Sequence, residues 1–255
     1  MRLIDGATAI GGDLPASWTT TVEVPSGAGS SQESGVDRLS SIEQVRDGMR
    51  AALGTQTGPT ITIGGDCGVE LAAIEHANSR GDIAVVWFDA HPDINTAASS
   101  PSGAFHGMVL RTLLGDGPAQ LVPASPLLPS RVVLAGTRAL DDSESDFIDA
   151  SGIRLLGPNE ITPDNLVEAL LATGAASVYL HIDLDVLDPS EFASLGFPEP
   201  FGLSLAQLLE LIDAARRALP LAGAGITEFA PSSPSATSDE LPVILRVIGA
   251  LTKKL

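Results

Sequence analysis

Acidic residues alternate with other residues directly after two apolar stretches of this 255-residue chain. The first group reads DAHPD at residues 89–93 and follows the apolar run 83–88, and the second reads HIDLD at residues 181–185. Side chains two apart on extended backbone share a face, so Asp89, His91 and Asp93 can point into one pocket. Pro92 cannot donate to a sheet ladder, so the strand must end there. Because several buried carboxylates need neutralisation, the pattern predicts a metal ion held by oxygen ligands.

Each acidic motif has other interpretations when it is taken alone. DAHPD is also compatible with a solvated acidic loop, and a D-x-D pair such as Asp183 and Asp185 also occurs in aspartyl phosphatases and sugar transferases. The phosphatase chemistry uses an interior lysine, whereas the only lysines here are Lys253 and Lys254 at the carboxyl end. Their position also argues against Schiff-base chemistry and phosphate-binding loops.

Two further residues follow apolar strand-like segments. Cys67 lies in GGDCG at residues 64–68, where the glycines permit a tight turn after the run 60–63. Glu228 follows the run 223–227, and a buried carboxylate there can accept a planar guanidinium bidentately.

These residues need a scaffold that brings strand ends together. Short apolar runs alternate with segments of helical periodicity, which predicts an α/β fold with a parallel sheet covered by helices on both faces. We expect one domain over residues 1–255, and ligands beyond the carboxyl ends of the strands. The predicted strands are residues 60–63, 83–88, 131–135, 177–182 and 223–227, and the predicted helices are residues 36–53, 69–78, 106–114, 163–172, 205–219 and 239–251.

The composition excludes several classes of partner. The chain has 32 acidic and 14 basic residues and a formal charge of -18, so neither nucleic acid nor an anionic membrane surface is an expected partner. No apolar stretch approaches the roughly 18 residues of a membrane span. A single cysteine cannot form an internal disulfide, and the first residues do not read as a signal peptide. The sequence therefore predicts a cytoplasmic protein.

Five ordered motifs give the chain a specific resemblance. It resembles the ureohydrolase family of arginases and agmatinases, whose pieces are matched by GGDCG at 64, WFDAHPDINT at 87, SGAFHGM at 102, HIDLDVLDP at 181 and GITEFAP at 225. The resemblance implies a three-layer α/β/α domain with a mainly parallel sheet. It also implies a binuclear Mn²⁺ centre that hydrolyses a guanidino group to an amine and urea, and assembly as a homo-oligomer, a trimer or hexamer.

The resemblance also implies roles for individual residues. One metal would take Cys67, Asp89, Asp93 and Asp183, and the other would take Asp89, His91, Asp183 and Asp185. A metal-bridging hydroxide would attack the guanidinium carbon. Glu228 would orient the substrate, Asp93 would pass a proton to the departing amine, and His106 would shuttle protons.

The substrate implied by the resemblance is an α-amino acid with a guanidino end. Asn95 and Ser102 match positions that bind the α-carboxylate, and Asp141 matches the aspartate that meets the α-amino group. Arginine or a close analogue such as hydroxyarginine is therefore expected. The alternatives are formiminoglutamate or agmatine hydrolysis, or a non-catalytic relative with a degenerate metal site.

Two positions depart from the family pattern. The family usually has histidine where this chain has Cys67, and a thiolate favours Zn²⁺ or Fe²⁺ over Mn²⁺. His181 is one replacement ligand, although we expect a buried histidine that packs in the core or supports a ligand. After Pro189, arginases have a small threonine-containing turn, whereas this chain has LGFP at residues 195–198. Phe197 is therefore expected near the guanidino pocket, where it would alter specificity. His76 matches no motif and is expected to be structural.

Overall fold

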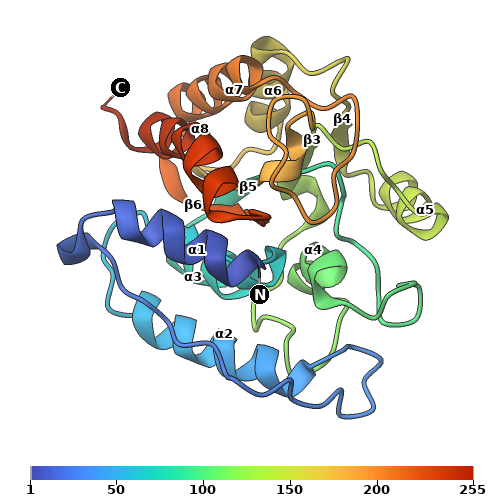
Figure 1. Cartoon of the computed structure of the whole chain (residues 1–255). Coiled ribbons are helices and arrows are strands. Elements are labelled where there is room, and N and C mark those ends of the chain that lie inside the picture. Colours follow the sequence, from blue (N-terminus) through green and yellow to red (C-terminus); the bar gives the residue numbers. More distant parts are fainter. Residues whose placement is uncertain (1, 255) are drawn as a thin grey trace.

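A computed structural model describes residues 2–254, whose strands form one six-stranded parallel sheet (Figure 1). The order across the sheet is β1-β6-β5-β2-β3-β4, and every neighbouring pair is parallel. The strands are β1 (Ile61–Ile63), β2 (Ile83–Phe88), β3 (Val132–Ala135), β4 (Arg154–Leu156), β5 (Ser177–Asp183) and β6 (Leu221–Thr227). All carboxyl ends therefore lie at one edge of the sheet.

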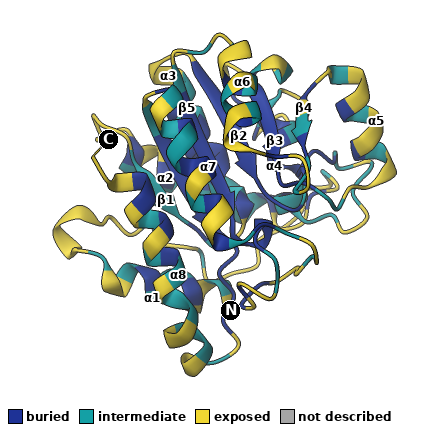
Figure 2. Cartoon of the chain, turned by 90° about the horizontal axis from the view of Figure 1, so that it is seen from above, coloured by how far each residue is buried: buried dark blue, intermediate teal, exposed yellow. Residues whose placement is uncertain are grey.

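Helices cover both faces of this sheet. One hydrophobic cluster joins alternate residues of β2, such as Val86, to α6 (Pro163–Ala172), α7 (Leu205–Ala218) and α8 (Pro234–Thr252), and includes Ile10 of α1 (Arg2–Asp13). The other joins Val85 and Trp87 to α2 (Leu39–Leu53), α3 (Glu70–Arg80), α4 (Val109–Leu113) and α5 (Asp142–Ser151). Figure 2 shows the central strands β5, β2 and β3 dark blue between outer helices with exposed faces. The three-layer α/β/α prediction is confirmed.

Strand β2 shows why its sequence is apolar throughout. All six residues from Ile83 to Phe88 are buried, because helices pack on both faces of this central strand. Its register pairs Trp87 with His181 of β5, and β5 in turn pairs His181 with Gly225 of β6. These three residues thus lie in one row across the sheet, just below the edge where the acidic motifs begin.

Several elements differ from the sequence prediction. The predicted helix 106–114 begins with a 3₁₀ turn over Phe105–Met108 and becomes α-helical only at Val109. Helix α8 begins at Pro234 rather than 239, because Ser233 caps it by accepting from the backbone N–H of Ala236 and proline suits the first turn.

Three elements were not predicted from the sequence, namely α1, β4 and α5. Strand β4 has only three residues, too few for a periodic pattern. Helix α1 contains three glycines, but Gly6 lets it approach Phe229, whose carbonyl oxygen would lie 2.0 Å from an added Cβ. Tertiary packing therefore outweighs poor helix propensity here. Within residues 2–254 no helix is long and apolar enough to cross a membrane.

Candidate metal centre

The acidic motifs converge at the carboxyl edge of the sheet. Asp89 follows β2, Asp183 ends β5, Cys67 lies in the turn between β1 and α3, and Glu228 follows β6. Parallel strands place their carboxyl ends side by side, so residues up to 161 positions apart in sequence meet in one site.

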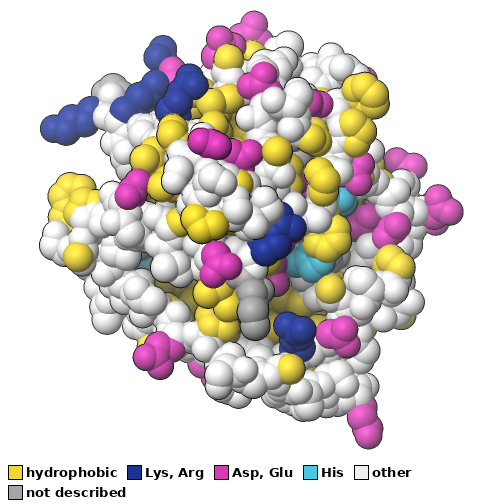
Figure 3. Space-filling model, viewed as in Figure 1, with side chains coloured by type: hydrophobic (Ala, Val, Ile, Leu, Met, Phe, Trp, Pro, Cys, Tyr) yellow, Lys and Arg dark blue, Asp and Glu magenta, His cyan; other side chains and the backbone are white. Residues whose placement is uncertain are grey.

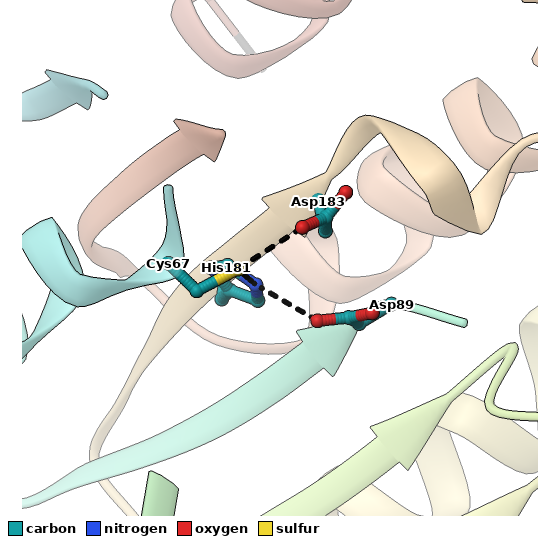
Figure 4. Close-up of side chains that lie close together, drawn as sticks. All are labelled: Cys67, Asp89, His181 and Asp183. Carbon is teal, nitrogen blue, oxygen red and sulfur yellow. Dashed lines mark hydrogen bonds and ion pairs between the residues drawn. The ribbon is translucent and has the colours of Figure 1, made fainter. Parts of the chain in front are cut away.

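A first group of metal-ligand atoms consists of Cys67, Asp89, His181 and Asp183 (Figure 4). One ligand atom from each residue lies within 4.8 Å of the others, and all four side chains are buried. The Cys67 thiol donates to Asp183 Oδ2 over 3.0 Å, and its Sγ lies 3.8 Å from His181 Nε2. Cys67 comes from the turn after β1 and Asp89 from the end of β2. His181 and Asp183 both come from β5, where they share one face.

A second group consists of Asp89, His91 and Asp185. His91 Nδ1 lies 2.9 Å from Asp185 Oδ2 and 3.5 Å from Asp89 Oδ1. The backbone N–H of Ala90 donates to Asp185 Oδ1 over 3.0 Å, which fixes that carboxylate. The two groups share Asp89.

Asp93 adjoins the cluster without belonging to either group. Its backbone has φ 53°, a left-handed conformation that is uncommon for a non-glycine residue, and its side chain is buried. Among residues 2–254 its Oδ2 has no hydrogen-bond partner. Glu228 has φ 66°, and such conformations concentrate at functional sites because the surrounding structure must hold them.

Charge repulsion dominates the electrostatics of the cluster. Burial, followed by the neighbouring carboxylates, raises the pKa of Asp93 and Asp183 well above the usual range. Burial and Asp89 raise the pKa of Asp185 to about 6. Burial and the Asp183 carboxylate raise the pKa of the Cys67 thiol.

The two histidines respond in the opposite direction. Burial lowers the pKa of His91, but its contacts with Asp185 and Asp89 outweigh this effect and raise it to about 12. Burial also lowers the pKa of His181, but the contacts with Asp89 and Glu70 outweigh this effect and raise it to about 9. The site therefore attracts positive charge strongly.

This donor set fits divalent metal ions. Four buried carboxylates, at residues 89, 93, 183 and 185, lie in or beside the two ligand groups, to which His91 and His181 contribute imidazoles. Such a cluster is costly unless cations neutralise it, and the unpartnered Asp93 oxygen is a free donor atom in the residues described. Carboxylate, imidazole and thiolate are all metal ligands, so a metal centre is the arrangement that best explains these residues.

A pocket of about 340 Å³ opens beside the cluster. It is lined by Glu228, His106 and Phe197, and the Phe197 ring stacks on His106 with centroids 5.1 Å apart. The predicted metal ligands are not among its lining residues. Burial and nearby carboxylates, Asp66 first, raise the pKa of Glu228 to about 8. Arg2 of α1 also lines the pocket and donates to the carbonyl of Ala230.

The residues expected to bind the amino-acid end of a substrate are only partly brought together. Asn95 Nδ2 donates to Asp141 Oδ2 over 2.9 Å, and Asn95 Oδ1 accepts from the hydroxyls of Ser99 and Ser143. Ser102 is exposed and accepts from the backbone N–H of Ala104. These three predicted residues lie outside the lining of the pocket.

Sequence reasoning did not find Glu70, and it did not expect His181 among the ligand atoms. Glu70 is the first residue of α3, is fully buried, and approaches His181 from the side away from Cys67. The signal that points to it is GGDCGVE followed by a helix, in which a glutamate occupies a position otherwise suited to an apolar core residue. His76 Nε2 lies 3.4 Å from Arg80 Nη1 on the same helix, and His76 belongs to neither ligand group.

Surface charge is unevenly distributed on the face shown in Figure 3. Acidic side chains are scattered, whereas many of the basic ones gather at one corner, over α7 and the end of α8, and others lie nearer the middle of the face. Arg217 and Lys253 there both pair with Asp213. Most of the charge of -18 is thus surface charge outside the metal-ligand cluster.

Comparisons with known proteins agree with this geometry. The Arginase family model matches residues 8–247. The arginase of Staphylococcus aureus is 35% identical over 158 residues, which cover 56% of this chain and 51% of that protein. The arginase of Bacillus caldovelox is 37% identical over 155 residues, covering 56% and 52%. The chain therefore spans about half the length of these relatives in the matched region.

The fold comparison covers more of the chain. The crystal structure of Entamoeba histolytica arginase in complex with L-ornithine superposes with a TM-score of 0.83 at 26% identity, over 92% of this chain and 84% of that one. The parallel sheet, the carboxylates at its carboxyl edge and the match to the family model lead to the same assignment. This chain belongs to the arginase family.

Proposed function

We propose that this chain is a metal-dependent hydrolase that converts the guanidino group of arginine or a close analogue to an amine and urea. The observation that carries the proposal is the buried cluster of carboxylates and histidines beside a pocket lined by Glu228. Family membership supports it, and the related arginase solved with L-ornithine binds the amine that remains when arginine loses urea.

The residues proposed to hold metal are those that the family resemblance implies, and all of them except Asp93 also belong to the two ligand groups. One ion would be held by Cys67, Asp89, Asp93 and Asp183, and the other by Asp89, His91, Asp183 and Asp185. When bound, divalent cations lower the pKa of water and thereby supply a nucleophile near neutral pH. Manganese suits the second set, which is made mostly of oxygen ligands.

Glu228 is proposed to bind and orient the guanidinium. It is 4% exposed, and its carboxylate lines the pocket. A carboxylate in such a place accepts charge-assisted hydrogen bonds from a planar cation, and the cation in turn offsets the repulsion that raises the pKa of Glu228. The same contact holds the guanidinium carbon at a fixed position relative to the metal ligands.

Proton transfer is assigned to Asp93 and His106. The unpartnered Oδ2 of Asp93 lies at the cluster and is proposed to deliver a proton to the departing amine nitrogen. His106 lines the open pocket and is half-buried, so it can exchange protons between the site and solvent. Its stacking on Phe197 limits the positions that the imidazole can take.

Recognition of an α-amino acid would involve Asn95, Ser102 and Asp141, which lie outside the lining of the pocket. The Asn95–Asp141 hydrogen bond joins two of these residues and presents a carboxylate that suits an ammonium group. We also propose that the protein assembles as a homo-oligomer, a trimer or hexamer, which light scattering would measure.

A substrate panel tests the proposed activity. Urea or formamide release should be measured with arginine, hydroxyarginine, agmatine and formiminoglutamate after loading the protein with Mn²⁺ or Zn²⁺. We expect urea release, with arginine or hydroxyarginine the best substrate. Absence of product from all four substrates, with metal bound, would reject the enzymatic proposal.

A non-catalytic relative is the second candidate, because Cys67 stands where the family usually has histidine. An elemental count of the purified protein separates the two. Two ions per chain support the enzyme, whereas one or none, together with no activity after Cys67→His, supports a binding role.

A further inference from the structure

The imidazole of His181 faces the ligand atoms of the first group. Its Nε2 lies 3.8 Å from Cys67 Sγ and 3.5 Å from Asp89 Oδ2, and the side chain is fully buried. Trp87, its neighbour in the sheet, stacks on the ring with centroids 3.7 Å apart. The ring is therefore held with one nitrogen toward the cluster, as Figure 4 shows.

A buried carboxylate lies on the other side of the same ring. Oε1 of Glu70 is 3.6 Å from His181 Nδ1, and Glu70 is 0% exposed. Within residues 2–254, the two carboxylate oxygens of Glu70 have no hydrogen-bond partner. The Nδ1 atom of His181 has none either. These unpartnered buried groups face each other at slightly more than hydrogen-bond length, so a small shift of the ring would pair them.

The sheet makes room for this carboxylate. Gly225 is the β6 neighbour of His181, and a Cβ added there would lie 1.4 Å from Glu70 Oε1. No side chain fits at that position while Glu70 stays where it is. Glycine at residue 225 and the buried glutamate thus form one arrangement, which a purely apolar core would not require.

Carboxylate, imidazole and thiolate in this order form a metal-binding arrangement. A histidine ligand commonly donates its second ring N–H to a carboxylate, which fixes the tautomer and the ring orientation. Here such a bond from Nδ1 to Glu70 would leave Nε2 as the free donor atom toward Cys67 and Asp89. The replacement of a family histidine by Cys67 is then compensated by an imidazole from a different strand.

We propose that Cys67 and His181, with Asp89 and Asp183, hold one divalent cation, and that Glu70 is a positioning residue that orients the His181 ring. Binding would release the thiol proton of Cys67 to solvent. Because thiolate and imidazole are softer ligands than carboxylates, this site selects Zn²⁺ or Co²⁺ over Mn²⁺. The inference rests on the proposed metal centre but not on the proposed reaction.

Cobalt titration of the purified full chain tests the ligand set. Co²⁺ should give a thiolate-to-metal charge-transfer absorption in the near ultraviolet, and Cys67→Ser should abolish it. His181→Asn should weaken Co²⁺ affinity by about 10–100-fold, as loss of a ligand or of its support does. His76→Asn is the matched control, since this histidine lies on α3 outside the cluster, and it should change neither quantity.

Glu70→Gln keeps the folded shape and tests the positioning role separately. We expect the charge-transfer absorption to remain while Co²⁺ affinity falls by about 10–100-fold. X-ray absorption at the metal edge should show one sulfur ligand in the parent, and one imidazole fewer after His181→Asn. If His181→Asn does not fold, the Glu70→Gln affinity and the parent's sulfur ligand decide.

Some outcomes would overturn the inference. A parent protein without the charge-transfer absorption would show that Cys67 is not a ligand. His181→Asn and Glu70→Gln variants with parental Co²⁺ affinity would show that His181 is a structural histidine. These readouts do not depend on turnover. An inactive protein with the absorption would refute the reaction and leave the ligand set intact, whereas an active protein without it would refute the ligand set alone.

Discussion

Replacing Asp183 by asparagine should stabilise the metal-free protein and remove its response to metal. Asp183 is 2% exposed, its Oδ1 accepts from the backbone N–H of Asp185 over 2.8 Å, and its Oδ2 accepts from the thiol of Cys67 over 3.0 Å. An asparagine carbonyl keeps the first bond, and its amide can donate to the sulfur in place of the second. The substitution therefore removes an acidic group whose charged form burial and the neighbouring carboxylates disfavour, without leaving a buried polar group unpartnered.

The expected magnitudes follow from this geometry. Replacing buried ionic groups by neutral residues of similar volume is neutral or stabilises proteins by about 1–4 kcal/mol, and we expect Asp183→Asn to fall in the lower half of that range. Each kcal/mol raises the Tm of a domain of this size by roughly 2–4 °C. A metal at a hundredfold excess over its Kd adds about 2.7 kcal/mol to the free energy of unfolding, and the variant should lose most of that gain.

Thermal unfolding with chelator and with saturating Zn²⁺ or Mn²⁺ measures both effects. Asp183→Asn should have the higher Tm in chelator and the smaller rise on adding metal. Asp146→Asn is the matched control, because this aspartate is exposed on α5, and it should leave both values near those of the parent. A lower Tm for Asp183→Asn in chelator would show that the cluster is not under electrostatic strain, and the reasoning would fail.

Three further predictions concern the pocket and the core. Glu228→Gln should lower kcat/KM by about 10–150-fold, the equivalent of about 1.5–3 kcal/mol for a hydrogen bond to a charged group, with Tm unchanged within about 2 °C; steady-state kinetics with an unaltered kcat/KM would contradict the proposed guanidinium contact. Phe197→Ala should lower kcat/KM by up to about tenfold, because the aromatic pair with His106 contributes about 0.5–1.5 kcal/mol. Little change in Tm is expected since Phe197 is 55% exposed. A clear fall in Tm would indicate a folding role instead. Glu75→Gln should destabilise the protein by about 1.5–3 kcal/mol, because the partly buried Arg46 and Arg50 then donate to a neutral group instead of a carboxylate. Partial burial raises the pKa of Glu75, but hydrogen bonds from Arg50 and Arg46 lower it overall, so this stability is present above pH 4.5 and is lost as the pH falls through the depressed pKa; a urea-unfolding series that gives the same loss at pH 3 and pH 7 would contradict the assignment.

Much of the candidate site could be predicted because its residues lie at or directly after the carboxyl ends of apolar strands. Asp89 and Asp183 follow apolar runs, and parallel strands must end at a common edge, so alternation alone indicates a shared pocket. Glu228 could be predicted for the same reason. The three-layer arrangement follows from runs such as residues 83–88, which are apolar on both faces.

The part that sequence could not provide depends on lateral register. Whether His181 faces the cluster or the core is decided by its pairing with Trp87 and Gly225, which no local pattern specifies. Glu70 reads as an ordinary residue in the first turn of a helix until the space beside Gly225 is seen. Helix α1 escaped prediction because its glycines argue against a helix, and only its packing on Phe229 explains it.

The cation-dependent production of urea tests the central claim most directly. The purified chain should be stripped with chelator, reloaded stepwise with Mn²⁺ or Zn²⁺, and assayed with L-arginine at each metal-to-protein ratio. The account predicts that urea release is absent in chelator and rises with bound metal to a plateau near two ions per chain. Full metal occupancy without urea or another amidine-cleavage product, in folded protein, would contradict it.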